Sequence, residues 1–251
     1  MSERLTVATL NIRNLADRWW ERFALLAADF GALQPDLLGL QECVYVMHQD
    51  RLIGASGEGQ YAAIRGWAGR PEYGNSLLVR EPFVARDEGR LDLGVSGRAI
   101  HRALVQLPTG TTVLVAVTHL HHDPDEPEQR LRQVEQLLPW LDDGPPSDAQ
   151  IVMGDFNAHP DEPTYGAMVE AGFRSAFCEA NGVEPAVTWP TGLEAPMIDD
   201  TGSRGCLDYI FVRGAVSVDA ARVVFDRPDP QDPGLFPSDH VGLFTELTIG
   251  R

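Results

Sequence analysis

A strand–helix–strand rhythm in both halves of the chain constrains the fold more than any other feature. Residues 5–12 predict a buried strand, and residues 19–33 follow with apolar side chains about one helical turn apart. The apolar run 37–40 then predicts a second strand. In the other half, an apolar stripe over 126–141 predicts the clearest helix, and the strand 151–153 comes after it. We therefore expect two packed sheets with helices outside them.

Shorter runs complete the expected order of elements. Strand-like runs separated by Gly, Pro and Asp fall at residues 61–65, 76–79, 103–107, 112–117, 207–212, 220–225 and 241–248. A weaker helix is expected at 44–52 and another helix near 162–171, and 181–205 is expected to be irregular. No linker or change of composition interrupts this order. We therefore expect a single α/β (α+β) domain over residues 1–251.

Composition excludes several classes of protein. The chain is 43 % hydrophobic and 23 % charged, as expected of a protein with a sizeable core rather than a disordered one. No apolar run approaches the roughly 18–20 residues that cross a bilayer, and the N-terminal segment has no signal-peptide pattern. The 3 cysteines are widely spaced and form no zinc motif. These features favour reduced thiols and a cytoplasmic location.

The chain is strongly acidic. Its 20 basic side chains, all arginine, stand against 37 acidic ones, for a net charge of −17. Non-specific affinity for a polyanion comes mainly from basic side chains that release counterions. The charge therefore disfavours tight binding of long nucleic acid, although it allows a local basic site.

Polar side chains stand where the apolar strands begin or end. They are Asn11, Glu42, His119, Asp155, Asn157, Asp208, Asp239 and His240. Strand ends can converge on one rim of a pair of sheets, and hard oxygen ligands such as Glu42 and Asp239 suit Mg²⁺ or Mn²⁺ better than zinc. Each residue alone also has a structural explanation, since Asn11 could cap a turn and His240 could cap a helix or lie in the core.

The order of these motifs resembles that of the endonuclease/exonuclease/phosphatase superfamily, which has a DNase I-like fold. The resemblance covers essentially the whole chain and rests on Leu10-Asn11, Leu40-Gln41-Glu42, Thr118-His119, Gly154-Asp155-Phe156-Asn157, Leu207-Asp208-Tyr209-Ile210-Phe211 and Ser238-Asp239-His240. Tyr73-Gly74-Asn75-Ser76 matches more loosely. The resemblance implies a four-layer αββα sandwich of two mixed sheets with outer helices, and a metal-dependent phosphoric ester hydrolase.

The resemblance also implies a metal site. Glu42 would be the principal Mg²⁺ ligand, with Asn11 and Asp239 near the ion and Mn²⁺ as an alternative metal. The cation would neutralise a phosphate oxygen and the developing charge on the leaving group.

Five further residues would act on the substrate. His240 would face the scissile phosphate, and Asp208 would fix its tautomer. Asp155 and Asn157 would orient the attacking water and the phosphate, and His119 would donate a hydrogen bond to the phosphoryl group. Water would attack phosphorus in line without a covalent intermediate. Whether Asp155 or His240 takes the water proton stays open at this stage.

Several other residues are candidates for substrate contact. Asn75 and Arg98 are the candidate substrate-binding residues. Arg102 and Arg204 could also reach a phosphate, although a surface ion pair is the more common role for such arginines. Trp189 could pack beneath the site or line the cleft.

The cluster His121-His122 has two interpretations. Together with His119 it could form a transition-metal site, but the family motif uses only His119. We therefore expect His121 and His122 to be solvent-facing loop residues.

Two acidic loops bear on the substrate. Residues 123–128 and 226–232 are expected beside the active-site rim, where their field would repel a long polyanion. We therefore favour a small phosphodiester or phosphomonoester over DNA or RNA, and see no basic amphipathic helix for a lipid surface. The alternatives are a nuclease and a non-catalytic binding module that retains the fold. The oligomeric state stays open.

Overall fold

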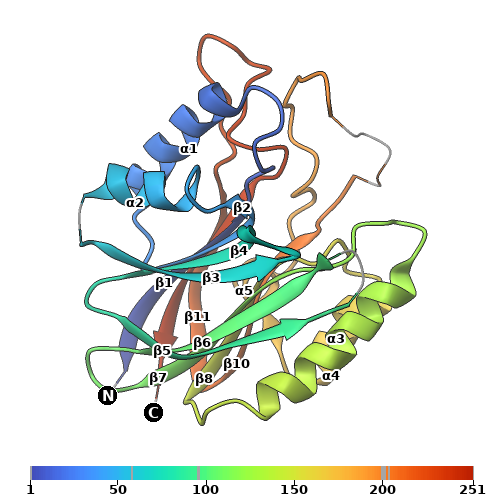
Figure 1. Cartoon of the computed structure of the whole chain (residues 1–251). Helices are drawn as coiled ribbons and strands as arrows, with labels where there is room; N and C mark the ends of the chain where they lie inside the picture. Colours follow the sequence, from blue (N-terminus) through green and yellow to red (C-terminus); the bar gives the residue numbers. More distant parts are fainter. Residues whose placement is uncertain (1, 58, 95–96, 199–201, 203, 251) are drawn as a thin grey trace.

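Two facing sheets of six strands each form the centre of the protein, with helices on their outer faces (Figure 1). The computed structural model describes residues 2–57, 59–94, 97–198, 202 and 204–250. Within these residues no helix is both long and apolar enough to span a membrane. The single-domain organisation and the cytoplasmic location expected from the sequence stay predictions.

The first sheet has the order β11-β12-β1-β2-β4-β3. Its strands are β1 (Glu3–Asn11), β2 (Leu37–Val44), β3 (Tyr61–Ala68), β4 (Arg70–Arg80), β11 (Val216–Val224) and β12 (Gly242–Ile249). Only β1 and β2 run parallel, joined by helix α1 (Trp19–Leu33). Leu26 and Phe30 of α1 and Leu52 of α2 (Gln49–Ser56) pack on the outer face of this sheet.

The second sheet repeats this plan with the order β5-β6-β7-β8-β10-β9. Its strands are β5 (Val84–Asp92), β6 (Ala99–Gln106), β7 (Thr112–His119), β8 (Ala149–Asp155), β9 (Arg174–Ser175) and β10 (Asp208–Gly214). The parallel pair β7 and β8 is joined by α3 (Pro127–Asp142). Leu137 of α3 and Met168 of α4 (Pro163–Glu170) pack on the outer face, and α5 (Ala176–Asn181) contacts β10 and β11.

The main core lies between the sheets. Leu37 of the first sheet and Val115 and Ile151 of the second belong to this buried cluster. Gly39 allows the sheets to approach closely, because a Cβ atom there would lie only 2.9 Å from the Sδ atom of Met153. The rigid core therefore fixes the relative position of the two sheet edges.

The two parallel pairs carry the polar residues to one end of the sandwich. β1 ends at Asn11 and β2 carries Glu42 near its end, while β7 ends at His119 and β8 at Asp155. The antiparallel neighbours begin where these strands end, since β10 starts opposite Asp155 and β12 pairs antiparallel with β1. This topology explains how residues far apart in the sequence meet in one place.

The predicted fold class is confirmed, and the differences from expectation are local. β5 was not expected because most of its residues are exposed, so its sequence has no apolar alternation. β9 and α5, with 2 and 6 residues, are too short for a periodic signal. The helix expected at 44–52 begins only at Gln49, since β2 continues to Val44, which pairs with Tyr73.

Candidate functional site

A pocket of about 470 Å³ opens at the end of the sandwich where these strands converge. Its walls carry most of the polar residues singled out from the sequence: Asn11, Glu42, Arg98, His119, Asp155, Asn157, Asp239 and His240. Asp208 lies directly behind His240 and is hydrogen-bonded to it. The volume is in the range of small-molecule sites.

Glu42 projects from an irregularity in β2. The β2–β4 register shifts between Leu40 and Cys43, and Glu42 has a φ of 57°, a left-handed conformation rare for a glutamate. Its Oε1 accepts from Asn11 Nδ2 at 3.5 Å, and its Oε2 accepts from Asn14 Nδ2 at 2.6 Å. Strained backbone of this kind is often found at functional sites.

Asp239 is held on another wall of the pocket. Its Oδ2 accepts from Arg13 Nη1 at 2.6 Å and from Trp189 Nε1 at 3.4 Å. Burial raises the pKa of Asp239, but the charges of His240 and Arg13 outweigh it and lower that pKa overall. Arg13 was not identified from the sequence, because its partner Asp239 lies near the other end of the chain.

Glu42, Asn11 and Asp239 fit a hard divalent cation. They offer two carboxylates and one amide, all oxygen donors, on the walls of one pocket. The set contains no thiolate or imidazole that would favour a softer metal. The assignment of these three residues as metal ligands stays a prediction.

The sequence Gly154-Asp155-Phe156-Asn157 forms the floor of the pocket. Gly154 has a φ of 137°, and a Cβ atom there would lie 2.0 Å from the carbonyl oxygen of Thr118, so only glycine fits. Asp155 accepts from Asn11 Nδ2 at 2.9 Å and from the backbone N–H of Asn157 at 2.9 Å. Asn157 also donates through Nδ2 to the carbonyl oxygen of Leu120 at 3.1 Å. This turn is rigid before any substrate arrives.

His240 lies between two buried carboxylates. Its Nδ1 is 2.9 Å from Asp208 Oδ2, and its Nε2 is 3.8 Å from Asp155 Oδ2. Burial lowers the pKa of His240, but Asp208 and Asp155 outweigh it and raise that pKa to about 10. Burial, and then the charge of Asp208, raises the pKa of Asp155 to about 7. The charges of these three groups therefore act on one another, and the groups form one electrostatic unit.

His119 has a different partner. Its Nδ1 lies 2.7 Å from Arg98 Nη1, and its Nε2 lies 3.4 Å from Asp155 Oδ2. Burial and then the charge of Arg98 lower the pKa of His119 well below its ordinary value. One pocket thus holds two histidines whose pKa values are shifted in opposite directions.

The remaining candidates lie in different surroundings. Asn75 is buried, and its Nδ2 donates to the carbonyl oxygens of Ala99 at 2.8 Å and Val117 at 3.3 Å, so it ties β4 to the second sheet. Its predicted role in substrate binding is untested. Trp189 both lines the pocket and donates to Asp239.

Two arginines considered from the sequence lie outside the pocket wall. The guanidinium of Arg102 stacks over Trp140 at 4.1 Å from the ring centre. Arg204 is exposed, and neither residue lines the pocket.

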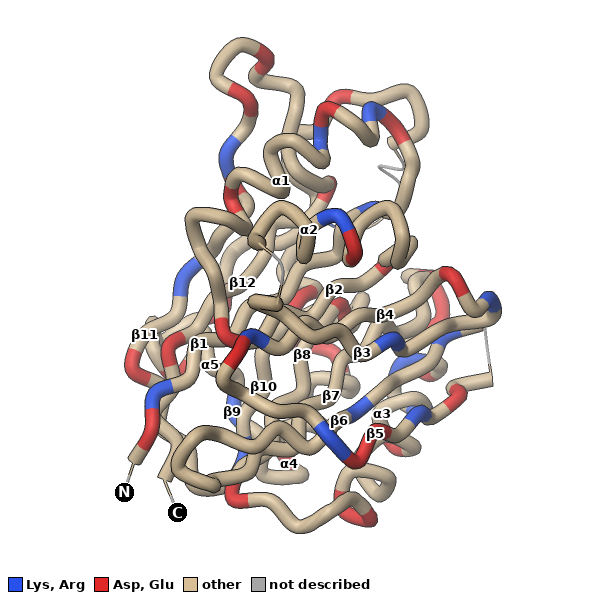
Figure 2. Tube along the Cα trace, turned by 60° about the vertical axis from the view of Figure 1, so that its left-hand side comes forward, with Lys and Arg blue, Asp and Glu red and all other residues tan. Residues whose placement is uncertain are grey.

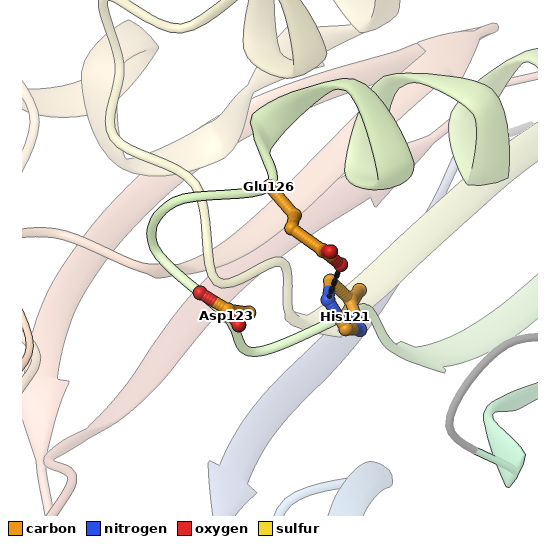
Figure 3. A group of neighbouring side chains, drawn as sticks. All are labelled: His121, Asp123 and Glu126. Atoms are coloured by element: carbon orange, nitrogen blue, oxygen red, sulfur yellow. Dashed lines mark ion pairs between the residues drawn. The ribbon is translucent and has the colours of Figure 1, made fainter.

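The expectation that His121 faces solvent is wrong. Its side chain is 6 % exposed, and its Nε2 lies 2.8 Å from Glu126 Oε2 (Figure 3). The backbone N–H of His121 donates to Gln133 Oε1 of α3, which holds this loop under the helix. His122 is exposed, as expected, and lines the pocket.

Only one of the two acidic loops borders the pocket. Loop 123–128 does so through Pro124, but none of residues 226–232 lines it. Asp226 and Arg227 instead line a separate groove of about 310 Å³ with Asp29 of α1. The second placement is therefore wrong, because the connection from β11 to β12 runs beside α1, where Asp232 pairs with Arg18.

Comparison with known protein sequences gives a family match. Residues 8–240 match the model described as the Endonuclease/Exonuclease/phosphatase family. The uncharacterized protein YbhP of Escherichia coli K12 is 29 % identical over 147 residues, which are 57 % of this chain and 52 % of YbhP. A probable CCR4-Not complex 3'-5'-exoribonuclease subunit Ccr4 of Encephalitozoon cuniculi is 28 % identical over 163 residues, 56 % of this chain and 32 % of that protein. The matched region thus spans about half of YbhP and a third of Ccr4.

Solved structures share the architecture. Zebrafish (D. rerio) TDP2, solved with a single-strand DNA product, has a TM-score of 0.80 at 18 % identity and covers 98 % of this chain and 99 % of its own. The human Nocturnin catalytic domain with bound sulfate has a TM-score of 0.79 at 22 % identity, and the match covers 98 % of this chain and 95 % of the Nocturnin chain. An endonuclease/exonuclease/phosphatase family protein of Bacteroides thetaiotaomicron has a TM-score of 0.80 at 20 % identity, and the match covers 100 % of this chain and 99 % of that chain. These likenesses show a DNase I-like fold.

Proposed function

Because this chain belongs to the endonuclease/exonuclease/phosphatase family, whose members are metal-dependent phosphoester hydrolases, we propose that it hydrolyses a small phosphodiester or phosphomonoester. One observation carries the proposal. The oxygen donors Glu42 and Asn11 share a single pocket with Asp155 and His240, which form a buried group with Asp208 behind them. A cation site beside a group that can take a proton is what hydrolysis of a phosphoester by water requires.

Glu42, Asn11 and Asp239 are the residues that hold the metal in this proposal, with Mg²⁺ or Mn²⁺ as the ion. When bound, the ion neutralises charge on the phosphate and on the leaving oxygen. No histidine belongs to this set, so His119 and His240 remain available to the substrate.

The other pocket residues act on the water and the phosphate. Asp155 and Asn157 orient a water molecule for in-line attack, in which a bond from the water oxygen to phosphorus forms as the bond to the leaving alcohol breaks. The water proton passes to Asp155 or His240, Asp208 holds the His240 ring in place, and the leaving alkoxide takes up a proton from solvent. His119 donates a hydrogen bond to the phosphoryl group.

Charge and volume support a small substrate. Two of the three pocket arginines are neutralised, since Arg13 pairs with Asp239 and Arg130 with Glu162. Among the described residues Arg98 has no ion pair with a carboxylate. The acidic loop 123–128 borders the opening and repels a long polyanion.

Hydrolysis of single-stranded nucleic acid is the second candidate, favoured by a different surface. Figure 2 shows arginines along β3 to β6, on an otherwise acidic molecule. Arg90 stacks 3.7 Å from the ring centre of Trp67, and Arg70 lies 5.7 Å from that of Tyr73, which lines the pocket. Arginine and aromatic side chains together suit single-stranded nucleic acid. The Ccr4 relative is named as an exoribonuclease, and TDP2 was solved with a single-strand DNA product.

A hydrolysis panel tests the proposal. Protein treated with chelator and then supplied with Mg²⁺ or Mn²⁺ is assayed on a chromogenic monoester, a chromogenic diester, single-stranded RNA and plasmid DNA. We expect metal-dependent turnover that is fastest on a small ester. Faster cleavage of single-stranded RNA would replace the small-ester proposal with the second candidate, and faster cleavage of plasmid would replace it with a nuclease of duplex DNA. No metal-dependent turnover on any substrate would favour a binding module.

Glu42→Gln tests the metal site within the same panel. A neutral amide keeps the shape but binds Mg²⁺ poorly, so we expect a loss on the order of a hundredfold or more. Glu88→Gln, at an exposed position of β5, is the matched control. Full activity of Glu42→Gln at ordinary Mg²⁺ would remove Glu42 from the site.

A further inference from the structure

The contact between Arg98 and His119 determines which ring nitrogen of His119 carries the proton. Arg98 Nη1 lies 2.7 Å from His119 Nδ1. A guanidinium only donates hydrogen bonds and stays protonated in proteins, so Nδ1 must be the acceptor. A neutral imidazole that accepts at Nδ1 carries its proton on Nε2. The chemistry of the arginine therefore settles which tautomer this histidine adopts.

We propose that Arg98 is a positioning residue that holds His119 as a neutral Nε2–H donor directed toward the bound phosphate. His119 and Asp155 both line the pocket, and His119 Nε2 lies 3.4 Å from Asp155 Oδ2. A donor at this place is ready before the substrate binds and needs no proton from solvent. The direction toward a phosphate rests on the proposed function, whereas the tautomer does not.

The fold holds both partners of this contact in place. Arg98 immediately precedes β6, and its carbonyl oxygen accepts from the backbone N–H of Leu93 at 3.0 Å. The next residue, Ala99, accepts from Asn75 Nδ2 of the other sheet at 2.8 Å. His119 is the last residue of β7 and is buried. The contact therefore joins the last residue of β7 to a residue held at the start of β6 by backbone hydrogen bonds.

The partner on Nδ1 gives His119 and His240 opposite properties. Asp208 accepts from Nδ1 of His240, which favours the protonated ring, whereas Arg98 donates to Nδ1 of His119, which favours the neutral one. Charged and titratable groups that face His119 are Arg98, Asp155, His240 and His122. Within the part of the chain that the structure describes, the group in hydrogen-bond contact with Nδ1 is the Arg98 guanidinium.

Nuclear magnetic resonance of the free protein tests the tautomer without any substrate. In protein labelled with ¹⁵N at histidine and treated with chelator, two-bond ¹⁵N–¹H correlations distinguish a protonated from an unprotonated ring nitrogen. We expect His119 to be neutral and Nε2-protonated throughout pH 5.5–8. In Arg98→Met we expect a mixture of tautomers. Arg86→Met removes an exposed arginine of β5 and should leave the signal unchanged.

Kinetics tests the consequence. We expect Arg98→Met to lower kcat on the order of tenfold to a hundredfold with little change in KM. Losses of this size are typical when a residue that orients an essential ligand or hydrogen-bond donor is removed. Arg98→Lys should recover part of kcat, because an ammonium can also donate to Nδ1. An increase confined to KM would make Arg98 a plain substrate-binding residue and overturn the proposal.

The two tests separate the inference from the proposed function. A His119 ring that is protonated on Nδ1, or that is doubly protonated at pH 6, would overturn the inference whatever the enzyme hydrolyses. If no phosphoester is hydrolysed but the Nε2–H tautomer depends on Arg98, the proposed function fails and the positioning role stands.

Discussion

Two groups of one histidine and two carboxylates differ sharply in how the chain builds them. Asp155, Asp208 and His240 come from distant parts of the sequence and are all buried. His121, Asp123 and Glu126 come from one short loop before α3 (Figure 3). In each group the nearest ligand atoms lie within 4.8 Å of one another. Composition and proximity alone therefore cannot tell them apart.

The difference lies in access to water. In the buried group, where little solvent reaches the side chains, the two acids raise the pKa of His240 to about 10 despite the opposing effect of burial. In the loop group, the Glu126 carboxylate is 50 % exposed, so water screens its attraction to His121. We infer that the first group does chemistry and the second fastens a loop.

The largest expected effect is on the buried group. We expect His240→Ala and Asp208→Asn each to lower kcat/KM by about a thousandfold or more, since they remove parts of one electrostatic unit. The double variant should be little worse than His240→Ala, because residues that act as a unit give non-additive losses. Thermal unfolding of each variant checks that the fold persists. Losses that add fully in log rate would mean that Asp208 does not act through His240.

A third buried histidine isolates the effect of burial. His101 is 2 % exposed, and neither ring nitrogen has a hydrogen-bond partner among the described residues. Gly66 leaves room for the ring, since a Cβ atom there would lie 2.0 Å from His101 Nδ1. Without an acid beside it, burial lowers the pKa of His101 to about 3. The carboxylates, not burial, thus account for the raised pKa of His240.

His101 predicts a dependence of stability on pH. Its folded pKa lies below the unfolded value of about 6.5, so the unfolded chain binds more protons and stability falls as pH falls below 6.5. Between pH 6.5 and 5, the free energy of unfolding should fall by about 2 kcal/mol more in wild type than in His101→Leu. Urea titrations at both pH values measure it. Parallel losses in the two proteins would show that His101 is protonated in the fold.

Much of the fold and the floor of the site follow from the sequence, for a local reason. Asn11, Glu42, Asp155 and His240 stand at strand ends, and apolar runs mark those ends whatever the rest of the chain does. Once the strands pair as a mixed sandwich, the ends must converge. The strand topology therefore brings polar residues that are far apart in the sequence together in one pocket.

What the sequence does not predict depends on contacts between distant segments. Nothing near Arg98 indicates that its donor meets His119, and nothing near Arg13 indicates Asp239. The sequence pattern makes His121 a solvent-facing loop residue because its position depends on Gln133, nearly two turns into α3. Such pairs have no period and no motif, so only the packed structure shows them.

A smaller effect concerns the acidic rim. Asp125→Asn with Glu128→Gln removes two exposed charges from the loop that borders the pocket. At low salt we expect cleavage of single-stranded RNA or plasmid to rise about fivefold and hydrolysis of a small diester to change less than twofold, because the rim repels flanking phosphates. The difference should vanish at high salt.

The matched control removes the same charge elsewhere. Glu88→Gln with Asp226→Asn changes two exposed acids that do not line the pocket. It should leave both substrates unaffected. An equal effect of the two double variants would mean that net charge, rather than the rim, limits nucleic acid cleavage.

The smallest expected effect tests the loop group itself. Glu126→Gln should lower the free energy of unfolding by only about 0.5 kcal/mol, and activity should stay within twofold, because a half-exposed ion pair contributes little. The loss should shrink as salt is raised, and Glu128→Gln, two residues along, should cause none. Urea titrations at low and high salt measure both. The hydrogen bond from the His121 backbone N–H to Gln133 keeps the loop in place in either variant.

Two results would contradict this view of the loop group. Glu126→Gln could lower the free energy of unfolding by several kcal/mol, or an added divalent cation could stabilise wild type but not Glu126→Gln. Either result would make the loop group a functional site like the buried one. Exposure would then not be what separates them.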